Sequence, residues 1–506
     1  TKKIELAAQN GMTISRRIEV QPVRLESTYL NYSPKKFGLP SDLCFCFDFA
    51  QLGMLQAMAY SGYYKWNGYR YEKQPVFDFS DGAPIQFVFD ANMDGLPDPA
   101  ENGLYLGQYS LNVAVNQGDG DFLKSSASFE LPGSGNIDSY IDINNDGLME
   151  RFYSGHDGTR GFYRVDMNEG LVKADGLFDL GDQLKNMDFC LDVCADFDRD
   201  GRLDILCTAR SESGRPYWVI LFNEGNGRWT VKPILQTNEP LSDMVAYDVD
   251  GDGYTDIVKR DWGTSKSVSR NLGNREFAEL EELDGYLLTM DIDQDGLADF
   301  QLRDDESIIV SNHGSPVQVP LTKCNLFHYD FADINNDGVP DYIDNDRSVI
   351  MRIANNNTAP TAPTTLIATQ TADEVIISWD GATDKESTTS QLRYNISIKE
   401  KGATGDDAYI WSPLNATSNQ ARMSLVPGIP TYYRQATRLP MPVSRFQAGK
   451  TYEICVQAID PWYASSPFSK VIEFTPQAEC HITLPAKAGV CLLYTSDAAD
   501  EARSVD

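Results

Sequence analysis

Short apolar runs separated by turn-forming residues make up most of this chain. The segments DILCTA (204–209), YWVILFN (217–223) and DIVKR (256–260) are rich in β-branched and aromatic residues and are bounded by Gly, Asn or Asp. No stretch keeps the apolar spacing of an amphipathic helix over several turns. The pattern therefore predicts an all-β protein built from many short strands.

An acidic loop recurs between these strand-like runs. Each copy has oxygen-bearing side chains at positions 1, 3 and 5, glycine at position 6 and an acid at position 9. In chain order, the first to sixth loops are DANMDGLPD (90–98), DINNDGLME (142–150), DFDRDGRLD (196–204), DVDGDGYTD (248–256), DIDQDGLAD (291–299) and DINNDGVPD (333–341). An eroded copy, DFAQLGMLQ (48–56), has Ala50, Leu52 and Gln56 where oxygen ligands are expected, so it should bind no metal.

The spacing of the loops predicts the architecture. Successive copies begin roughly 40 to 50 residues apart, with several short strands between them, which is typical of β-propeller blades. The first five intact loops are each followed by an Asn-x-Gly turn, which begins at Asn116, Asn168, Asn223, Asn271 or Asn312. Seven copies predict a seven-bladed β-propeller over residues 41–357. We expect residues 1–40, with the strand-like segment ISRRIEVQPVRL (14–25), to close it.

The chemistry of the loops favours calcium. Oxygens at positions 1, 3 and 5 can turn toward one point, glycine at position 6 permits a positive φ, and the carbonyl of position 7 can join them. Hard oxygen ligands without His or Cys favour calcium over transition metals, and magnesium demands a stricter octahedron. An EF-hand is excluded because strands flank the loops and position 12 varies, with Cys207 in the third loop and Lys259 in the fourth. Solvated Asp-Gly turns remain the alternative, which six matched copies disfavour.

Composition limits the classes of partner. The chain has 506 residues, which predicts two or three domains. Its formal net charge of -31 argues against nucleic acid or an anionic membrane as the main partner. No apolar run approaches the roughly 20 residues that span a bilayer. The start, TKKIELAAQN, has no apolar signal core, so any export signal is expected outside this sequence. Buried thiols and disulfides both remain open for the nine cysteines.

Over residues 41–357 the loops and their spacing resemble the FG-GAP/VCBS repeat family, which includes the integrin α-subunit head. The Phe-Gly and Gly-Ala-Pro elements are mostly absent, so the chain is more similar to the VCBS branch. The resemblance implies an extracellular or bacterial cell-surface interaction platform with up to six structural calcium ions. The ligands it implies are Asp90, Asn92, Asp94, Leu96, Asp98, Asp142, Asn144, Asp146, Leu148, Glu150, Asp196, Asp198, Asp200, Arg202, Asp204, Asp248, Asp250, Asp252, Tyr254, Asp256, Asp291, Asp293, Asp295, Leu297, Asp299, Asp333, Asn335, Asp337, Val339 and Asp341.

A second domain is expected after the linker IANNNTAPTAPT. The segments VIISWD (375–380), RYNISIKE (393–400) and TYEICVQAID (451–460) alternate as sandwich strands do. With Trp379 as core residue and Tyr452 as tyrosine corner, residues 358–476 resemble a fibronectin type III domain. Its long middle, 403–449, is either a decorated loop or a ligand-binding insertion. The join resembles that of exported Bacteroidetes surface proteins.

The end of the sequence carries a separate expectation. Residues 477–490 are expected to be a linker or the start of a truncated region. The segment CLLYTSDAADE (491–501) is similar to the read-through translation of a sequencing adapter, so residues 491–506 are expected to be an artefact. We therefore expect the natural chain to continue beyond this point, where a sorting or anchoring domain would follow.

Three functions remain open at this stage. The four histidines, His156, His313, His328 and His481, lie in no HExxH or other nucleophile motif, so an enzyme is not expected. The favoured function is a secreted or surface adhesion platform for a protein or glycan. A lyase-type polysaccharide-active enzyme would require a cleft of Arg, Tyr and acidic residues; candidates such as Arg160, Tyr163 and Tyr217 are scattered. A structural spacer is the third hypothesis.

Overall fold

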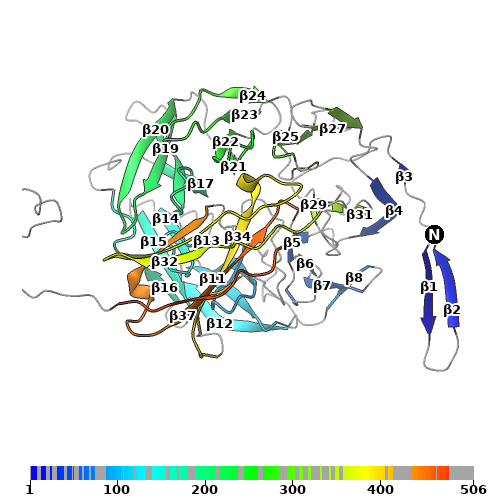
Figure 1. Ribbon diagram of the computed structural model, residues 1–506, viewed down its shortest axis with the longest axis horizontal. Coiled ribbons are helices and arrows are strands. Elements are labelled where there is room, and N and C mark those ends of the chain that lie inside the picture. Colours follow the sequence, from blue (N-terminus) through cyan, green and yellow to red (C-terminus); the bar gives the residue numbers. More distant parts are fainter. Residues whose placement is uncertain are drawn as a thin grey trace, which may run out of the picture.

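The computed structural model is built almost entirely of antiparallel β-sheets (Figure 1). It describes residues 2–7, 13–18, 23–24, 31–38, 43–47, 49–50, 56–59, 62–67, 70–74, 87–105, 108–118, 121–130, 140–154, 160–167, 170–180, 189–210, 216–236, 244–259, 266–283, 286–287, 291, 293, 295–301, 307–311, 317–320, 331–332, 341–343, 348–352, 357–404, 408–413, 436–462 and 464–477. The prediction of an all-β protein is confirmed.

The repeats form one four-stranded sheet after another, with neighbouring strands antiparallel. The first three sheets contain β5 (Leu43–Phe47), β6 (Gln56–Ala59), β7 (Gly62–Trp66) and β8 (Tyr71–Lys73); β9 (Phe87–Phe89), β10 (Asp98–Tyr105), β11 (Gln108–Asn116) and β12 (Phe122–Glu130); and β13 (Tyr140–Ile141), β14 (Glu150–Ser154), β15 (Arg160–Asp166) and β16 (Gly170–Lys173).

The next three sheets follow the same order. They contain β17 (Phe189–Ala195), β18 (Asp204–Arg210), β19 (Pro216–Asn223) and β20 (Trp229–Gln236); β21 (Met244–Tyr247), β22 (Asp256–Lys259), β23 (Lys266–Ser269) and β24 (Glu281–Leu283); and β25 (Tyr286–Leu287), β26 (Phe300–Gln301), β27 (Ser307–Val310) and β28 (Val317–Pro320). From β9 onward, each acidic loop connects the first and second strands of its sheet.

The seventh sheet joins the two ends of the repeat region. Its strands are β29 (Phe331–Ala332), β30 (Asp341–Ile343) and β31 (Ser348–Arg352), followed by β4 (Asn31–Gly38) and β3 (Val23–Arg24) from the start of the chain. β4 is antiparallel to β31, with Phe37 opposite Val349. Figure 1 shows the repeat sheets following one another in chain order around the molecule, while the hairpin β1 (Lys2–Ala7) and β2 (Thr13–Ile18) stands apart.

The continuous apolar runs are explained by sheets that are buried on both faces. On β19, Val219 and Leu221 pack toward the sheet of β13–β16, whereas Trp218 and Ile220 pack toward the sheet of β21–β24. Because side chains alternate between the two faces of a strand, a strand buried on both faces must be apolar at successive positions. The residues of the run YWVILF are therefore all apolar or aromatic because β19 lies between two neighbouring sheets.

The C-terminal part is a two-sheet sandwich. One sheet contains β32 (Leu366–Gln370), β33 (Glu374–Trp379) and β36 (Arg438–Pro442); the other contains β34 (Arg393–Glu400), β35 (Tyr409–Trp411), β37 (Tyr452–Ile459) and β38 (Ile472–Phe474). Both sheets contribute to one core that includes Trp379. The Tyr452 hydroxyl accepts a hydrogen bond from the Gln447 N–H at 2.8 Å, as a tyrosine corner does.

Helical structure is minimal in the described part of the chain. Two short 3₁₀ helices, η1 (Thr389–Gln391) and η3 (Val443–Arg445), both belong to the sandwich. No helix among the described residues is long and apolar enough to cross a membrane.

Candidate metal centres

The five loops that the structure describes share one hydrogen-bond skeleton. In each, the carboxylate at position 1 accepts the N–H of the position-6 glycine at 2.8–2.9 Å. The carboxylate at position 5 accepts the N–H of position 7 at 2.8 Å. These short-range bonds curl the loop around its own acidic side chains. The repeated sequence pattern therefore corresponds to a repeated local structure.

Positions 4 and 6 of the loops take up left-handed backbone conformations wherever the structure describes them. The position-6 glycines have φ between +84° and +92°, as their predicted role requires. Position 4 is also left-handed where it is described, with φ of +63° at Met93, +57° at Asn145, +62° at Arg199 and +73° at Gly251. Non-glycine residues rarely adopt this conformation, so the loop holds them there against a local cost. This second turn was not predicted from the sequence.

The acid at position 9 reaches back from the following strand to the loop. Asp98, Asp204 and Asp256 each accept two backbone hydrogen bonds: one from position 2 of their own loop, the other from an asparagine at or just after the end of the third strand of the sheet. Because two backbone donors hold each carboxylate, its position is fixed before any ion binds. These acids are buried, with at most 1% of the residue exposed.

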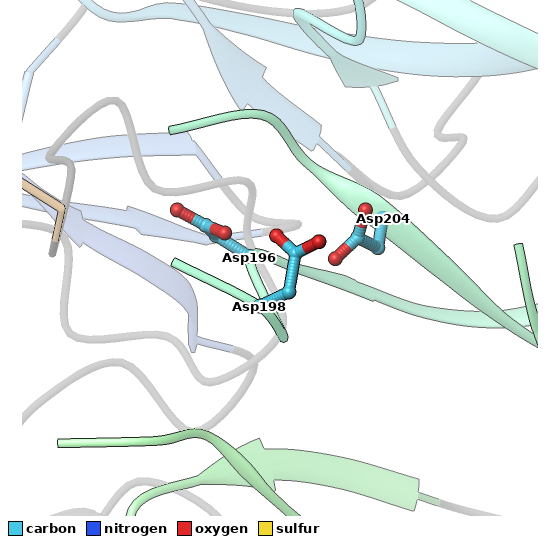
Figure 2. A group of neighbouring side chains, drawn as sticks. All are labelled: Asp196, Asp198 and Asp204. Atoms are coloured by element: carbon cyan, nitrogen blue, oxygen red, sulfur yellow. The ribbon is translucent and has the colours of Figure 1, made fainter. Parts of the chain in front are cut away.

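Among the described residues, three loops bring carboxylates close enough to share one cation. In the third and fourth loops the acids at positions 1, 3 and 9 place one oxygen each within 4.8 Å of the others; in the fifth loop the acids at positions 1, 3 and 5 do so. Figure 2 shows Asp196 and Asp198 on the third loop and Asp204 at the start of β18, with their carboxylates gathered together. The arrangement fits a hard divalent cation.

Burial makes these carboxylates costly to ionise without a cation. Burial, reinforced by neighbouring carboxylates, raises the pKa of Asp90 to about 8 and that of Asp256 to about 7. It also raises the pKa of Asp291 to about 7 and that of Asp248 to about 6. Each pKa lies well above the ordinary value of 3.8, since buried acids of like charge resist losing their protons. A bound divalent cation would favour the ionised forms.

Glu150 supplies independent support for a cation in the second loop. The residue is fully buried; its Oε2 accepts the Ile143 N–H at 3.1 Å, but its Oε1 accepts no hydrogen bond from any described residue. Burial, followed by the charges of Asp146 and Asp142, raises its pKa well above the usual range. A buried carboxylate oxygen without a donor is expensive unless something positive meets it. Glutamate at position 9 is therefore compatible with a ligand.

Arginines already balance part of the charge in two loops. Arg275 forms an ion pair with Asp198 in the third loop at 2.6 Å, and Arg270 forms one with Asp250 in the fourth at 2.8 Å. Within the third loop, Arg202 also pairs with Asp200 at 2.6 Å. These guanidinium groups bind the same kind of oxygen that a metal would use, so they can compete with a metal or share the carboxylates with it.

The asparagines of the Asn-x-Gly turns have a structural role that was not predicted from the sequence. The side-chain N–H groups of Asn116, Asn223 and Asn271 donate to carbonyls of their own loop and of a loop in the preceding sheet. The side-chain oxygens accept the N–H of the turn glycine. Each asparagine thereby ties two neighbouring sheets together. The signal was present in the sequence as a turn that recurs after each of the first five intact loops.

Some predicted ligands lie outside the described residues. These are Asp333, Asn335, Asp337 and Val339 of the sixth loop; its last member, Asp341, opens β30 and is buried. In the eroded loop, Asp48 and Leu52 are likewise not described. Gln56 takes the place of the position-9 acid, and its Oε1 accepts the Ala50 N–H at 2.7 Å. The uncharged amide of Gln56 thus accepts a backbone hydrogen bond similar to the one that the position-9 carboxylates accept in the intact loops.

Comparison with known proteins supports a repeat of this kind. A family model described as an FG-GAP-like repeat matches residues 196–258, a segment that contains the third and fourth loops. No curated protein was found to match the chain.

Two solved structures were also aligned with the chain. The FN1–FN3 domains of chicken CNTN1 have 10% identity and a TM-score of 0.15, over 65% of this chain and 77% of that one. The extracellular domain of a one-component system from B. thetaiotaomicron has 10% identity and a TM-score of 0.22, over 92% of this chain and 83% of that one. At these TM-scores neither likeness supports a fold or a function.

Proposed function

We propose that this protein is a calcium-stabilised, extracellular binding platform. The observation that carries the proposal is the repeated loop: five described copies share one hydrogen-bond skeleton around buried acidic side chains. A set of ordinary surface turns would not bury Asp98, Asp256 and Asp299 completely. Six calcium ions, one per intact loop, are the cofactors of this proposal, with ligands at positions 1, 3, 5 and 9 and the carbonyl of position 7.

The proposed architecture is a seven-bladed β-propeller followed by a fibronectin type III-like sandwich. Seven successive sheets of at least four strands, the last completed by β4, support the propeller. Sheet orders β32-β33-β36 and β35-β34-β37-β38, together with the Tyr452 corner, support the sandwich. In such a fold the loops connect the first and second strands of each blade, so bound calcium would stabilise the framework rather than act on a substrate.

The proposed partner is a protein or glycan met outside the cell. The FG-GAP-like match and the strong net negative charge support an extracellular binding role over a nucleic-acid or anionic membrane partner. We assign the loop carboxylates to calcium rather than to catalysis because backbone N–H groups already hold their positions from several sides. The proposed function is therefore binding without an enzymatic step.

Thermal unfolding tests the calcium part directly. The whole chain would be melted in millimolar calcium, in millimolar magnesium and in chelator, and calcium binding would be counted by isothermal titration calorimetry. At a calcium concentration 100-fold above its dissociation constant, each site should add about 2.7 kcal/mol to the free energy of unfolding. We expect a large rise in melting temperature with calcium that magnesium does not reproduce. Identical melts in calcium and chelator, with no heat of binding, would refute the proposal.

A further inference from the structure

The sandwich lies directly on the acidic loops of the repeat region. A Cβ added to any of the five described position-6 glycines would approach a sandwich atom within about 3 Å. The atoms met are Ser412 Oγ (2.8 Å) at Gly95, the Ile410 carbonyl oxygen (2.6 Å) at Gly147, the Arg438 carbonyl oxygen (2.6 Å) at Gly201, Ser390 Cβ (2.9 Å) at Gly253 and Thr388 Cγ2 (3.0 Å) at Gly296. These glycines therefore meet two demands, a positive φ and the close approach of a second domain.

At the fifth loop the sandwich contacts a predicted metal ligand itself. Gln391 Nε2 donates to Asp291 Oδ2 at 2.6 Å, and Trp462 Nε1 donates to the Asp291 carbonyl oxygen at 2.6 Å. Asp291 is 1% exposed and Trp462 is 5% exposed, so both contacts are sheltered from water. The backbone and the carboxylate of one ligand residue are thus both held by the other domain.

The two donors are themselves fixed within the sandwich. Gln391 Oε1 accepts the Thr388 N–H at 3.0 Å, which sets the direction of the amide toward Asp291. The Trp462 backbone N–H donates to Asp460 Oδ1 at 2.9 Å, and Asp460 is also buried. A donor that is already ordered loses little freedom when it meets its acceptor, so these contacts favour one orientation of Asp291 over others.

A second attachment point lies at the third loop. Arg202 Nη2 donates to both Glu374 oxygens at 2.7 Å, joining position 7 of that loop to the first residue of β33. Its side chain and that of Glu374 are 13% and 18% exposed, so the pair is only weakly screened by water. This contact does not involve a predicted side-chain ligand, which distinguishes it from the contacts at the fifth loop.

We propose that calcium at the fifth loop and docking of the sandwich are thermodynamically coupled, with Gln391 and Trp462 as positioning residues for the ligand Asp291. This inference rests on the proposed calcium function. A metal needs Asp291 in one orientation, and the docked sandwich supplies that orientation. By linkage, docking then raises calcium affinity at this loop, and calcium favours the docked state by the same factor. A partner that binds the docked protein must use a surface other than these covered loops.

Calcium titration of the whole chain tests one direction of this coupling. Gln391→Ala removes the donor to Asp291, while Gln447→Ala makes the same change at an exposed sandwich position. We expect Q391A to weaken one calcium site roughly tenfold, within the range seen for coupled sites, and to leave the other sites unchanged. Q447A should titrate like the wild type. A Q391A isotherm indistinguishable from that of Q447A would overturn the coupling.

Small-angle X-ray scattering tests the other direction. Asp293→Asn removes a carboxylate from position 3 of the fifth loop but keeps Asp291, and Asp94→Asn removes a carboxylate from position 5 of the first loop. As calcium is lowered, D293N should show the larger maximum dimension of an undocked sandwich at a concentration where D94N is still compact. If all three proteins stay compact in chelator although the wild type binds calcium, the coupling is wrong and the proposed function stands. Absence of calcium binding in the wild type would refute both.

Discussion

The first and second loops differ from the third and fourth in the side chain at position 3 and in the group that forms a hydrogen bond with it. Asn92 and Asn144 donate their own amide N–H to the position-5 aspartate of the same loop, at 2.8 and 3.1 Å. Asp198 in the third loop and Asp250 in the fourth instead accept a hydrogen bond from an arginine side chain outside the loop. The donors are Arg275 and Arg270, respectively. The backbone bonds at positions 1 and 5 are nevertheless closely similar.

This difference separates the shape of a loop from its charge. The shape follows from backbone N–H groups that donate to positions 1 and 5, so Asn and Asp are interchangeable at position 3. The charge depends on side chains that approach from elsewhere, and these differ from loop to loop. The sites should therefore bind calcium with graded affinities, although their sequences look like copies.

The largest expected effect is the change with pH in the free energy of unfolding of the metal-free protein. The folded pKa is about 8 for Asp90 in the first loop but about 6 for the equivalent Asp248 in the fourth, against 3.8 for an ordinary aspartate. Between the ordinary and the raised value the folded state binds more protons than the unfolded state. Stability from these groups therefore falls as pH rises from about 4 to about 8, by up to about 1.4 kcal/mol per pH unit for each group.

Urea unfolding from pH 4.5 to 8.5 measures this slope. In calcium the slope should flatten, because the cation keeps the carboxylates ionised over the whole range. Asp90→Asn should lower the slope over the whole range up to about pH 8, whereas Asp248→Asn should lower it only below about pH 6. Slopes that are equal with and without calcium would contradict the assignment of these acids to a metal.

Replacing a position-6 glycine should cause the next largest loss of stability. This loss should be equal in a loop with Asn at position 3 and in a loop with Asp there. Gly147→Ala and Gly201→Ala each place a Cβ 2.6 Å from a sandwich carbonyl oxygen, at φ of +84° and +88°. We expect each to lower the free energy of unfolding by about 3 kcal/mol. Gly402→Ala is the control: its φ is +80° but nothing lies within 4 Å, so it should cost only about 1 kcal/mol. Unequal losses at Gly147 and Gly201 would show that the skeleton is not shared.

Removing an arginine should lower stability only through the third and fourth loops, where an arginine forms an ion pair with the aspartate at position 3. Without calcium, Arg275→Ala leaves Asp198, whose side chain is 11% exposed, without this ion pair, and we expect a loss of about 2 kcal/mol. In calcium the loss should shrink, since the ion takes over the role of the guanidinium. Arg70→Ala, which breaks an exposed pair with Glu72, should cost less than about 0.5 kcal/mol in either condition. A loss at Arg275 that calcium does not reduce would show that arginine and metal do not share these oxygens.

Exchanging Asn and Asp at position 3 should have the smallest effect. The change that lowers the stability of the metal-free protein should strengthen calcium binding. Asn144→Asp makes the second loop similar to the third but adds no arginine. We expect it to destabilise the metal-free protein by about 1 kcal/mol, through like-charge repulsion and loss of the amide donor, and to tighten calcium binding about tenfold. Asp198→Asn is the mirror change and should weaken binding. Calorimetric titration of both variants decides the outcome; weaker binding by N144D would reverse the proposed dependence on charge.

Local features of the site could be predicted from the sequence because they depend on near neighbours. Asp196, Asp198 and Asp204 were placed together from their spacing alone, and their carboxylates do gather. Every bond in the loop skeleton joins residues at most five apart. The left-handed turn at position 4 was missed because Met93 and Arg199 are not residues that signal it.

The strand-rich, all-β character and the acidic loops could be predicted from the sequence, since alternation, short spacing and turn residues act over a few positions. Long-range packing decides which arginine meets Asp198, which strand from the start of the chain pairs with β31, and which residues of the sandwich cover the fifth loop. Arg275 and Asp198 lie 77 residues apart, and Trp462 and Asp291 lie 171 apart. No local pattern encodes such pairs, because they arise from packing sheet on sheet and domain on domain.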